Sequence, residues 1–318
     1  MEKMKVFIAD SIAKEGMAEF ARYPELELVV KTGLSPEKLA AELGDCVGLV
    51  VRSATQASRD VICAGRSLKV IGRAGAGVDN IDVKAASERS IVVLNTPGGN
   101  AEAAGELAVA MMFCLAREIA RADASMKAGT WDKKSFSGCE LLGKTLGLIG
   151  IGNVGSIVGT RALGLGMKVI ACDPFVSADK TKALGFAPAG FDEVIRAADF
   201  ISVHAPRTPE TKGILNAGTF AKMKKGVYIL NCARGGIVVE KDLLAALEDG
   251  TVKGAGIDVY EKEPPDDWSL ARHPRVLATP HIGASTAEAQ VNVSVMIAKQ
   301  IAAYLIRGEV INAVNGVK

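Results

Sequence analysis

The sequence has no pair of closely spaced cysteines. Six cysteines are present, but none forms a C-x-x-C motif, which excludes the usual patterns of zinc sites, haem attachment and dithiol exchange. We therefore expect no metal site and a reducing, cytoplasmic location. The cysteines are Cys46, Cys63, Cys114, Cys139, Cys172 and Cys232.

Basic runs and long apolar runs are also missing. The formal net charge is +2 and the lysines and arginines do not cluster, so we expect no nucleic-acid partner and a small-molecule substrate. The apolar core after Met1 is too short for a signal peptide, and the run from Leu107 to Ala116 is too short to span a bilayer. These absences predict a protein that does not enter a membrane.

The alternation of short Val- and Ile-rich runs with helical patterns predicts two parallel α/β domains in this chain of 318 residues. A helical segment over 100–127 separates the two series of strands, and a helical stretch over 285–307 is expected to return to the first domain. The predicted strands are 4–10, 26–32, 47–53, 69–75 and 91–97, then 145–150, 168–173, 200–205, 227–233, 254–260 and 276–279.

A G-x-G-x-x-G turn follows the apolar run that begins the second series. Gly150 permits a tight turn, Gly152 lets the backbone approach a pyrophosphate, and Gly155 lets the next helix pack closely on the strand. Such a motif alone is weak, because glycines also serve ordinary turns. Asp173 strengthens it, because this residue ends the next apolar run, where a carboxylate can accept hydrogen bonds from a ribose. The carboxylate would repel a 2′-phosphate, so NAD is favoured over NADP.

Polar residues that end later apolar runs are the candidates for chemistry. Arg234, Glu263 and His281 follow three strands of the second series and can converge on one edge of the sheet. A guanidinium can hold a carboxylate, an imidazole can exchange a proton with an alcohol, and a carboxylate can orient the imidazole. The residues alone do not rank His281 above His204, which also ends a strand, whereas His273 is expected in a surface loop.

The first half offers a second, different glycine-rich segment. Val70–Asn80 has the spacing G-x-x-G-x-G, which is not a dinucleotide motif, and its arginine and backbone amides can bind an anion. Ordinary structural turns are the alternative. The candidate substrate-binding residues are Arg52, Ser53, Arg73, Gly75, Ala76 and Gly77.

Several segments together resemble the D-2-hydroxyacid dehydrogenase family. They are Gly150–Gly155, Asn231–Gly236, Gly256–Pro264 and Pro280–Thr286, and within the family Val51–Thr55, Gly72–Asn80 and Phe113–Arg117 resemble the members that act on 3-phosphoglycerate. The resemblance implies that Arg234 binds the substrate carboxylate, that His281 is the acid/base, and that Glu263 is its partner. It gives His204 a role near the cofactor.

The resemblance also implies the remaining contacts and the assembly. It implies a Rossmann domain, 99–285, inserted in a smaller flavodoxin-like substrate domain made of 1–98 and 286–318, and a homodimer built largely on the cofactor domain. The implied cofactor contacts are Gly150, Gly152, Asn153, Val154, Gly155, Asp173, His204, Ala205, Cys232, Ala233, Asp258, Gly283, Ala284 and Ala76.

Two departures from the family pattern affect these expectations. Ala76 and Ala205 stand where threonines are usual, which puts contacts of those hydroxyl groups in doubt. The sequence ends at Lys318, so we expect no serine feedback through a carboxyl-terminal regulatory domain. The expected activity is the NAD-dependent oxidation of a D-2-hydroxy acid, first of all 3-phosphoglycerate, in serine biosynthesis. The alternatives are a hydroxypyruvate/glyoxylate reductase, a sulfolactate dehydrogenase, or an NAD(H)-sensing corepressor-like binding protein.

Overall fold

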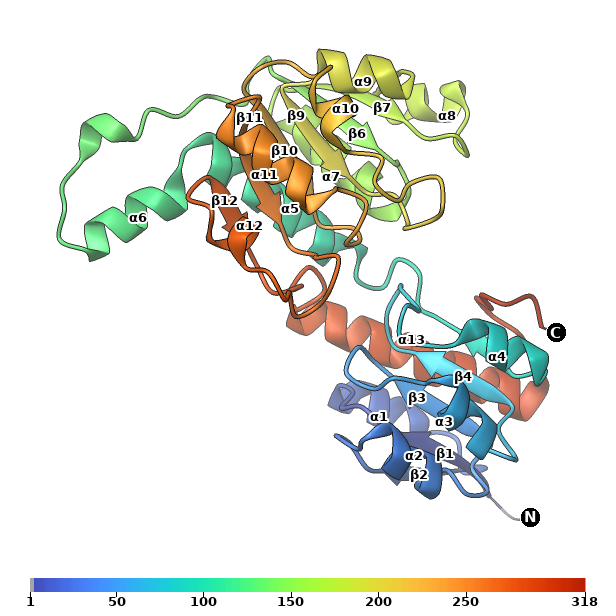
Figure 1. Ribbon diagram of the computed structural model, residues 1–318. Helices are drawn as coiled ribbons and strands as arrows, with labels where there is room; N and C mark the ends of the chain where they lie inside the picture. Colours follow the sequence, from blue (N-terminus) through green and yellow to red (C-terminus); the bar gives the residue numbers. More distant parts are fainter. Residues whose placement is uncertain (1–2, 318) are drawn as a thin grey trace. The chain divides into compact units, whose positions relative to one another are not determined.

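The computed structural model describes residues 3–317 and divides the chain into two compact units (Figure 1). Unit 1 contains Met1–Asn100 and Ser285–Lys318, and unit 2 contains Ala101–Ala284. Each unit has one sheet, and all pairs of its named strands are parallel. The predicted α/β class with two parallel sheets is therefore confirmed.

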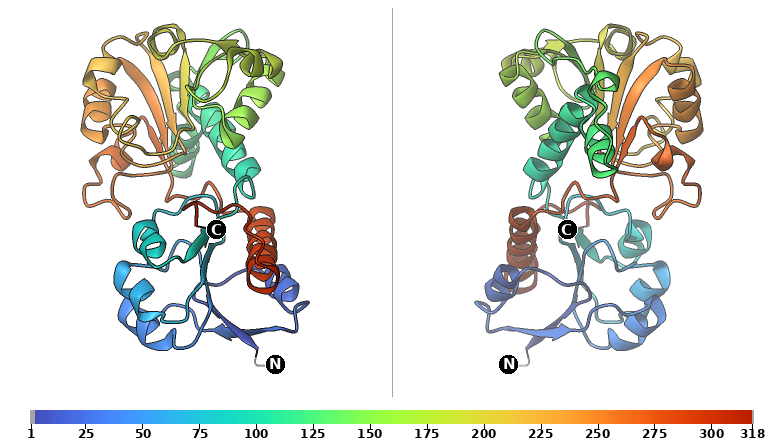
Figure 2. Two further views of the ribbon diagram at one scale, coloured as in Figure 1. Left: turned by 90° about the vertical axis from the view of Figure 1, so that its right-hand side faces the viewer. Right: turned by 90° about the vertical axis from the view of Figure 1, so that its left-hand side faces the viewer.

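Unit 1 has the strand order β2-β1-β3-β4-β5, which is the flavodoxin-like order. Helices α2, α3 and α4 cover one face of this sheet, and α1 and α13 cover the other (Figure 2). The strands are β1 (Met4–Ile8), β2 (Leu26–Val30), β3 (Gly48–Val51), β4 (Val70–Arg73) and β5 (Val92–Leu94). The helices are α1 (Lys14–Phe20), α2 (Pro36–Glu42), α3 (Arg59–Ala64), α4 (Val83–Glu88) and α13 (Ala287–Arg307).

Helix α13 is the one described helix that is long and apolar enough to cross a membrane by length and composition. Half of its most apolar window is buried inside the structure, however. Ile297 and Ile301 pack so closely on β4 that a Cβ atom added to Gly72 would lie 2.5 Å from the Ile301 side chain. Its apolar face is therefore explained by packing on the core of unit 1.

Unit 2 has the strand order β12-β11-β10-β9-β6-β7-β8, a Rossmann arrangement with one additional strand, β12, at its edge. Two apolar cores lie on the two faces of this sheet. The strands are β6 (Thr145–Ile149), β7 (Lys168–Cys172), β8 (Ala187–Pro188), β9 (Phe200–Val203), β10 (Val227–Asn231), β11 (Val252–Ile257) and β12 (Val276–Ala278). The helices are α5 (Ala101–Ala116), α6 (Ile119–Lys127), α7 (Asn153–Gly164), α8 (Ala178–Ala183), α9 (Phe191–Ala197), α10 (Ala217–Phe220), α11 (Glu240–Glu248) and α12 (Ser269–Arg272), with a 3-10 turn at Lys133–Ser135.

The prediction of one helical segment over 100–127 is wrong, because two helices occupy it. The carbonyl of Ala116, which a continuous helix would use for its own ladder, accepts a hydrogen bond from the amide of Cys139 at 2.7 Å. Glu118 then takes a left-handed conformation with φ 53° and starts α6 in a new direction. The short edge strand β8 was also missed, since two residues carry no alternating pattern.

Candidate active site

The G-x-G-x-x-G turn joins β6 to α7 at the carboxyl edge of the unit 2 sheet. Gly150 has φ +89°, and a Cβ atom on it would lie 2.8 Å from the carbonyl oxygen of His204. A Cβ on Gly155 would lie 2.2 Å from the oxygen of Gly150, whereas one on Gly152 would meet nothing within 4 Å. The turn therefore needs glycine at its first and third positions for packing and leaves the second open to a ligand.

Asp173 follows β7 and lies beside this turn. Its Oδ2 atom accepts a hydrogen bond from the amide of Ile151 at 2.9 Å, and its Oδ1 atom accepts one from Phe175 at 2.9 Å. A carboxylate has acceptor capacity beyond these two bonds, so it can also accept from ribose hydroxyl groups. The open glycine, the amino end of α7 and this carboxylate together fit a dinucleotide with an unphosphorylated ribose.

Arg234 is carried by a turn that begins at the end of β10. The buried side chain of Asn231 shapes this turn, because its Oδ1 accepts from the amide of Ala233 at 3.2 Å and its Nδ2 donates to the carbonyl of Arg234 at 3.0 Å. A Cβ on Gly235 would lie 1.7 Å from the carbonyl oxygen of Tyr260. The turn is thus pressed against the loop after β11, which carries Glu263.

His281 and Glu263 form a direct pair. His281 Nδ1 lies 2.6 Å from Glu263 Oε2, and the other carboxylate oxygen accepts a hydrogen bond from the amide of Tyr260 at 3.1 Å. Both side chains line a pocket of about 590 Å³ in unit 2. His281 has φ 51°, a strained conformation for a histidine, and its amide is held by the carbonyl of Asp258 at 2.8 Å.

The pair and Arg234 influence each other electrostatically. The hydrogen bond to Glu263 is the main reason why the pKa of His281 is raised above its ordinary value of 6.5, and Arg234 acts in the opposite direction. Burial by itself would raise the pKa of Glu263, but the hydrogen bonds from His281 and Tyr260, with the charges of His281 and Arg234, lower it overall. Three of the predicted residues are therefore brought together around an ionised carboxylate.

The other two histidines have different surroundings. His204 Nε2 lies 2.8 Å from the hydroxyl oxygen of Ser202, and burial lowers the pKa of His204 to about 4. It is neutral near pH 7 and has no carboxylate partner among the described residues, which favours His281 as the proton-transfer group. The prediction that His273 lies in a surface loop is wrong about the surface: His273 follows α12 in a loop, but it is only 8% exposed, and its Nε2 lies 3.2 Å from Glu248.

Asp258 supports the loop that carries His281. The carboxylate is fully buried and accepts hydrogen bonds from the Thr279 hydroxyl at 2.6 Å and from the amides of Ile282 and Gly283 at 2.8 and 2.9 Å. The Asp258 carboxylate therefore bonds to groups of the protein itself. Asn231 and Thr279 were missed as site residues, because each supports a neighbouring group, the turn of Arg234 or the carboxylate of Asp258, and neither carries the chemistry itself.

The remaining predicted cofactor contacts lie at the ends of the same strands. Asn153 and Val154 begin α7, Ala205 follows β9, and Ala284 ends unit 2. Cys232 and Ala233 lie between β10 and Arg234, and burial raises the pKa of the Cys232 thiol to about 12, so it stays protonated. Within residues 3–317, no group of three or more His, Cys, Asp or Glu side chains could hold a metal ion.

The predicted substrate-binding residues of unit 1 lie at the carboxyl ends of its own strands. Arg52 and Ser53 follow β3, and Arg73 ends β4. The glycine-rich segment after Arg73 contains Gly75, Ala76 and Gly77, and the side chain of Asn95 donates to the carbonyl of Ala76 at 2.6 Å. The two segments that contain Arg52 and Arg73 therefore lie at the same edge of the unit 1 sheet, where the strands have their carboxyl ends.

The chain is similar to known proteins over almost its whole length. Residues 109–283 match the family described as D-isomer specific 2-hydroxyacid dehydrogenase, NAD binding domain. The chain is 49% identical over 286 residues to a D-3-phosphoglycerate dehydrogenase of Homo sapiens, and 48% identical over 313 residues to one of Archaeoglobus fulgidus. These matches cover 90% and 98% of this chain but 54% and 59% of the relatives, so the chain spans little more than half of their length.

A solved structure agrees with these sequence matches. The NAD⁺-bound 3-phosphoglycerate dehydrogenase of Entamoeba histolytica superposes with a TM-score of 0.83 at 30% identity and covers 99% of this chain and 100% of its own. Unit 2 thus has the fold and the glycine-rich turn of a dinucleotide-binding domain. The chain belongs to the D-isomer specific 2-hydroxyacid dehydrogenase family, and NAD is its cofactor.

Proposed function

We propose that the protein oxidises a D-2-hydroxy acid to its 2-keto acid with NAD⁺, and that 3-phosphoglycerate is its main substrate, as in the first step of serine biosynthesis. The observation that carries the proposal is the 2.6 Å contact between His281 and Glu263 beside Arg234 in a NAD-binding unit. The free thiols of all six cysteines support a cytoplasmic location.

The three side chains divide the work of a 2-hydroxy acid dehydrogenase. When bound, NAD⁺ supplies the acceptor for the hydride that leaves C2 of the substrate. Arg234 binds the substrate carboxylate through its planar guanidinium, which fixes the hydroxyl group relative to His281. His281 takes the hydroxyl proton on Nε2, and Glu263 stabilises the imidazolium through Nδ1. In the reverse direction the charged imidazole returns the proton to the keto oxygen.

The pH dependence follows from this arrangement. Oxidation needs neutral His281, and its raised pKa means that the imidazole keeps its proton to a higher pH than a free histidine. We expect kcat/KM for oxidation to rise with pH with a midpoint above 6.5, and kcat/KM for keto-acid reduction to fall there. Glu263→Gln should move both midpoints to lower pH. Unchanged midpoints in pH profiles of that variant would contradict the pairing.

Substrate choice is the test of the proposed function. Arg234 serves one carboxylate, so the phosphate of 3-phosphoglycerate needs further cations, and we propose Arg52 and Arg73. Losing one charge-assisted contact costs about 1.5–3 kcal/mol, so Arg52→Ala and Arg73→Ala should each raise KM for 3-phosphoglycerate about 10- to 100-fold and leave KM for glyoxylate nearly unchanged. NADH absorbance across a panel of phosphorylated and unphosphorylated 2-hydroxy and 2-keto acids measures this.

A matched control separates recognition from stability. Arg59→Ala removes another unit 1 arginine, one that pairs with Glu88 at 2.7 Å, and should change no KM. Equal losses on all substrates in Arg52→Ala and Arg73→Ala, or a wild type that prefers hydroxypyruvate or glyoxylate, would argue against the phosphoglycerate assignment. Absence of turnover on every acid would favour an NAD(H)-sensing binding protein.

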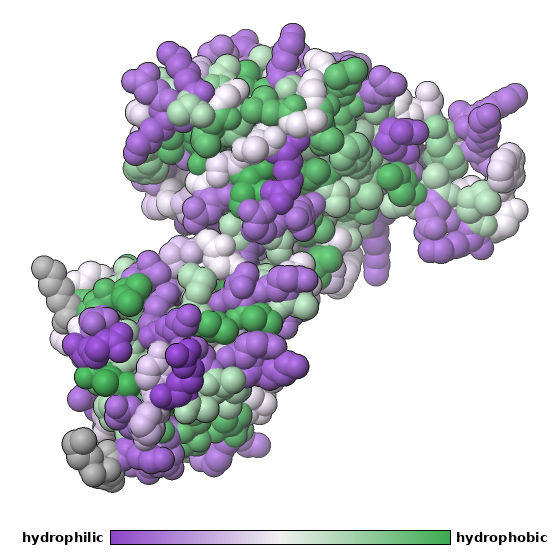
Figure 3. Space-filling view, turned by 180° about the vertical axis from the view of Figure 1, so that it is seen from behind, coloured by the Kyte–Doolittle hydropathy of each residue, from purple (hydrophilic) through white to green (hydrophobic). Residues whose placement is uncertain are grey.

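We also propose that unit 2 pairs with a second copy of the chain. Most of the apolar run Leu107–Leu115 of α5 packs inside its own unit, where Ala108, Met111 and Met112 are at most 1% exposed. Exposed apolar side chains lie instead on the arm, which we define as residues 117–140. Helix α6 in the arm has no buried residue, and Trp131 is 80% exposed. The arm stands out from unit 2 as a separate lobe (Figures 1 and 3).

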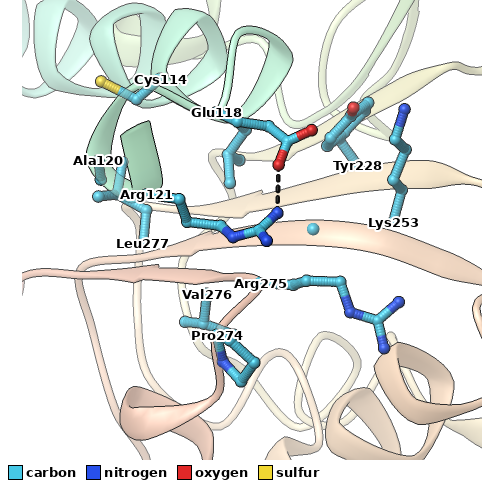
Figure 4. A pocket seen from close by; sticks show the side chains of 12 residues that line it. Cys114, Glu118, Ala120, Arg121, Tyr228, Lys253, Pro274, Arg275, Val276 and Leu277 are labelled. Carbon is cyan, nitrogen blue, oxygen red and sulfur yellow. Dashed lines mark hydrogen bonds and ion pairs between the residues drawn. The ribbon is translucent and has the colours of Figure 1, made fainter. Parts of the chain in front are cut away.

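A pocket near the base of the arm supports this proposal. It is lined by the apolar Leu115 and Leu277 and by Tyr228. Arg121, Lys253 and Arg275 lie around it (Figure 4). The lining contains three cations and one carboxylate, Glu118, which pairs with Arg121. The pocket therefore carries a net positive charge. The arm carries exposed apolar side chains, Met126 and Trp131, that an apolar pocket on a second copy can bury.

The oligomeric state tests the pairing. A buried tryptophan at an interface is often worth 2 kcal/mol or more, so Trp131→Asp should raise the dimer dissociation constant at least about 30-fold in sedimentation equilibrium. Phe175→Asp is the matched control, since Phe175 is an aromatic residue that is 92% exposed outside the arm. A dimer that tolerates Trp131→Asp, or dissociates equally with Phe175→Asp, would count against the arm.

A further inference from the structure

A buried side-chain network fixes the loop that carries Arg52. The carboxylate of Asp10, which follows β1 and is 6% exposed, accepts hydrogen bonds from the amides of Arg52 and Thr55 at 2.5 and 3.2 Å. Its other oxygen accepts from the Thr55 hydroxyl at 2.8 Å. One carboxylate is thus bonded to both ends of the segment 52–55.

Asn80 also bonds to the segment 52–55, but it bonds to carbonyl groups where Asp10 bonds to amides. Its Nδ2 atom donates to the carbonyl of Arg52 at 2.7 Å and to that of Thr55 at 2.6 Å. Asn80 belongs to the glycine-rich segment after β4, and its own carbonyl accepts from the amide of Ala57 at 2.9 Å. The two segments of unit 1 that carry Arg52 and Arg73 are therefore joined by side-chain bonds and not only by the sheet.

The bonds from Asp10 and Asn80 to the segment 52–55 do not involve the two backbone amides in its middle. The amides of Ser53 and Ala54, both exposed, donate to no residue within the described range 3–317. The guanidinium of Arg52 is steadied by the carbonyl of Ser11 at 3.1 Å. These donors lie after β3, next to β1, where the strand order β2-β1-β3-β4-β5 reverses direction, and ligands of such sheets bind at that point.

We propose that Asp10, Thr55 and Asn80, which we call the loop clamp, are positioning residues for the phosphate group of the substrate. They hold Arg52 and the amides of Ser53 and Ala54 in one conformation before the anion arrives, so that binding does not have to order the loop. The inference rests on the proposed function. It adds that affinity for the anion depends on three residues that do not touch it.

The test uses the whole protein and two phosphate readouts. KM for 3-phosphoglycerate measures the substrate, and the inhibition constant of inorganic phosphate against glyoxylate reduction measures the anion site without a phosphorylated substrate. Asn80→Ala and Thr55→Val should raise both constants about tenfold, with kcat on glyoxylate and KM for NADH within about twofold of wild type. Thr55→Ser keeps the hydroxyl group and should restore wild-type constants.

Asp82→Ala is the matched control for stability, because alanine cannot cap the start of α4. Asp82 accepts a hydrogen bond from the amide of Ala85 at 2.8 Å at the start of α4 and makes no bond to the segment 52–55. This variant should lower the melting temperature without changing either phosphate constant. The loop clamp is refuted if Asn80→Ala leaves both constants unchanged, or if it lowers activity on all substrates in the same proportion.

The two proposals fail in different ways. A wild type that turns over only unphosphorylated acids contradicts the proposed function, and the inhibition constants of inorganic phosphate in wild type and variants still decide the loop clamp. If inorganic phosphate inhibits Arg52→Ala as strongly as it inhibits the wild type, phosphate binds elsewhere and the loop clamp is refuted. Wild type that phosphate does not inhibit refutes it as well.

Discussion

His281→Ala should lower kcat about 10²- to 10⁴-fold in both directions, which is the usual loss when a general acid or base is removed. NADH should still bind, because the glycine-rich turn between β6 and α7 is not altered. Stopped-flow or steady-state NADH absorbance gives kcat, and the fluorescence of bound NADH gives its dissociation constant. The loss should appear in kcat and not in cofactor affinity.

His204→Gln is the comparison variant for this experiment. His204 also ends a strand of unit 2, but it contacts the Ser202 hydroxyl and its pKa is lowered to about 4. Glutamine can keep a hydrogen bond to that hydroxyl, so kcat should change much less than in His281→Ala. If His204→Gln were the crippling change and His281→Ala nearly silent, the assignment of the proton-transfer group would be wrong.

The sequence predicts the framework of unit 2 because its motif requires specific backbone chemistry. Gly150 and Gly155 have no space for a Cβ, and Gly152 leaves the backbone open to a ligand. The spacing of the three glycines therefore predicts the geometry of the turn between β6 and α7. The positions of Arg234, Glu263 and His281 could be predicted for a related reason. In a parallel sheet the carboxyl ends of the strands meet at one edge, so polar residues that follow successive strands come together.

Residues whose hydrogen bonds only support the site could not be predicted in this way. Asn231 and Thr279 bond to neighbouring groups whose positions depend on the turn that they help to form. The burial of His273 depends on the packing of α12, which four residues of sequence do not reveal. The break between α5 and α6 depends on Cys139, which bonds to Ala116 across more than twenty residues. Local patterns contain no information about such distant partners.

Arg234→Lys should reduce kcat/KM for every 2-hydroxy acid about 10- to 100-fold, although the site stays cationic. Lysine is a point charge, whereas the guanidinium can hold both oxygens of a carboxylate in one plane and so orient C2 and its hydroxyl group toward His281. Because Asn231 bonds to the backbone on both sides of this position, the turn itself should persist in the variant.

The control for Arg234→Lys is Arg207→Lys, since Arg207 lies against Gly236 of the same turn and has no assigned role. It should leave kcat/KM within about twofold of wild type, which would separate loss of the planar donor group from disturbance of the turn. The loss at Arg234 should also be shared by phosphorylated and unphosphorylated acids, because all of them carry the carboxylate. Near-normal kinetics in Arg234→Lys would remove Arg234 from carboxylate binding, and a loss confined to phosphorylated acids would place it at the phosphate instead.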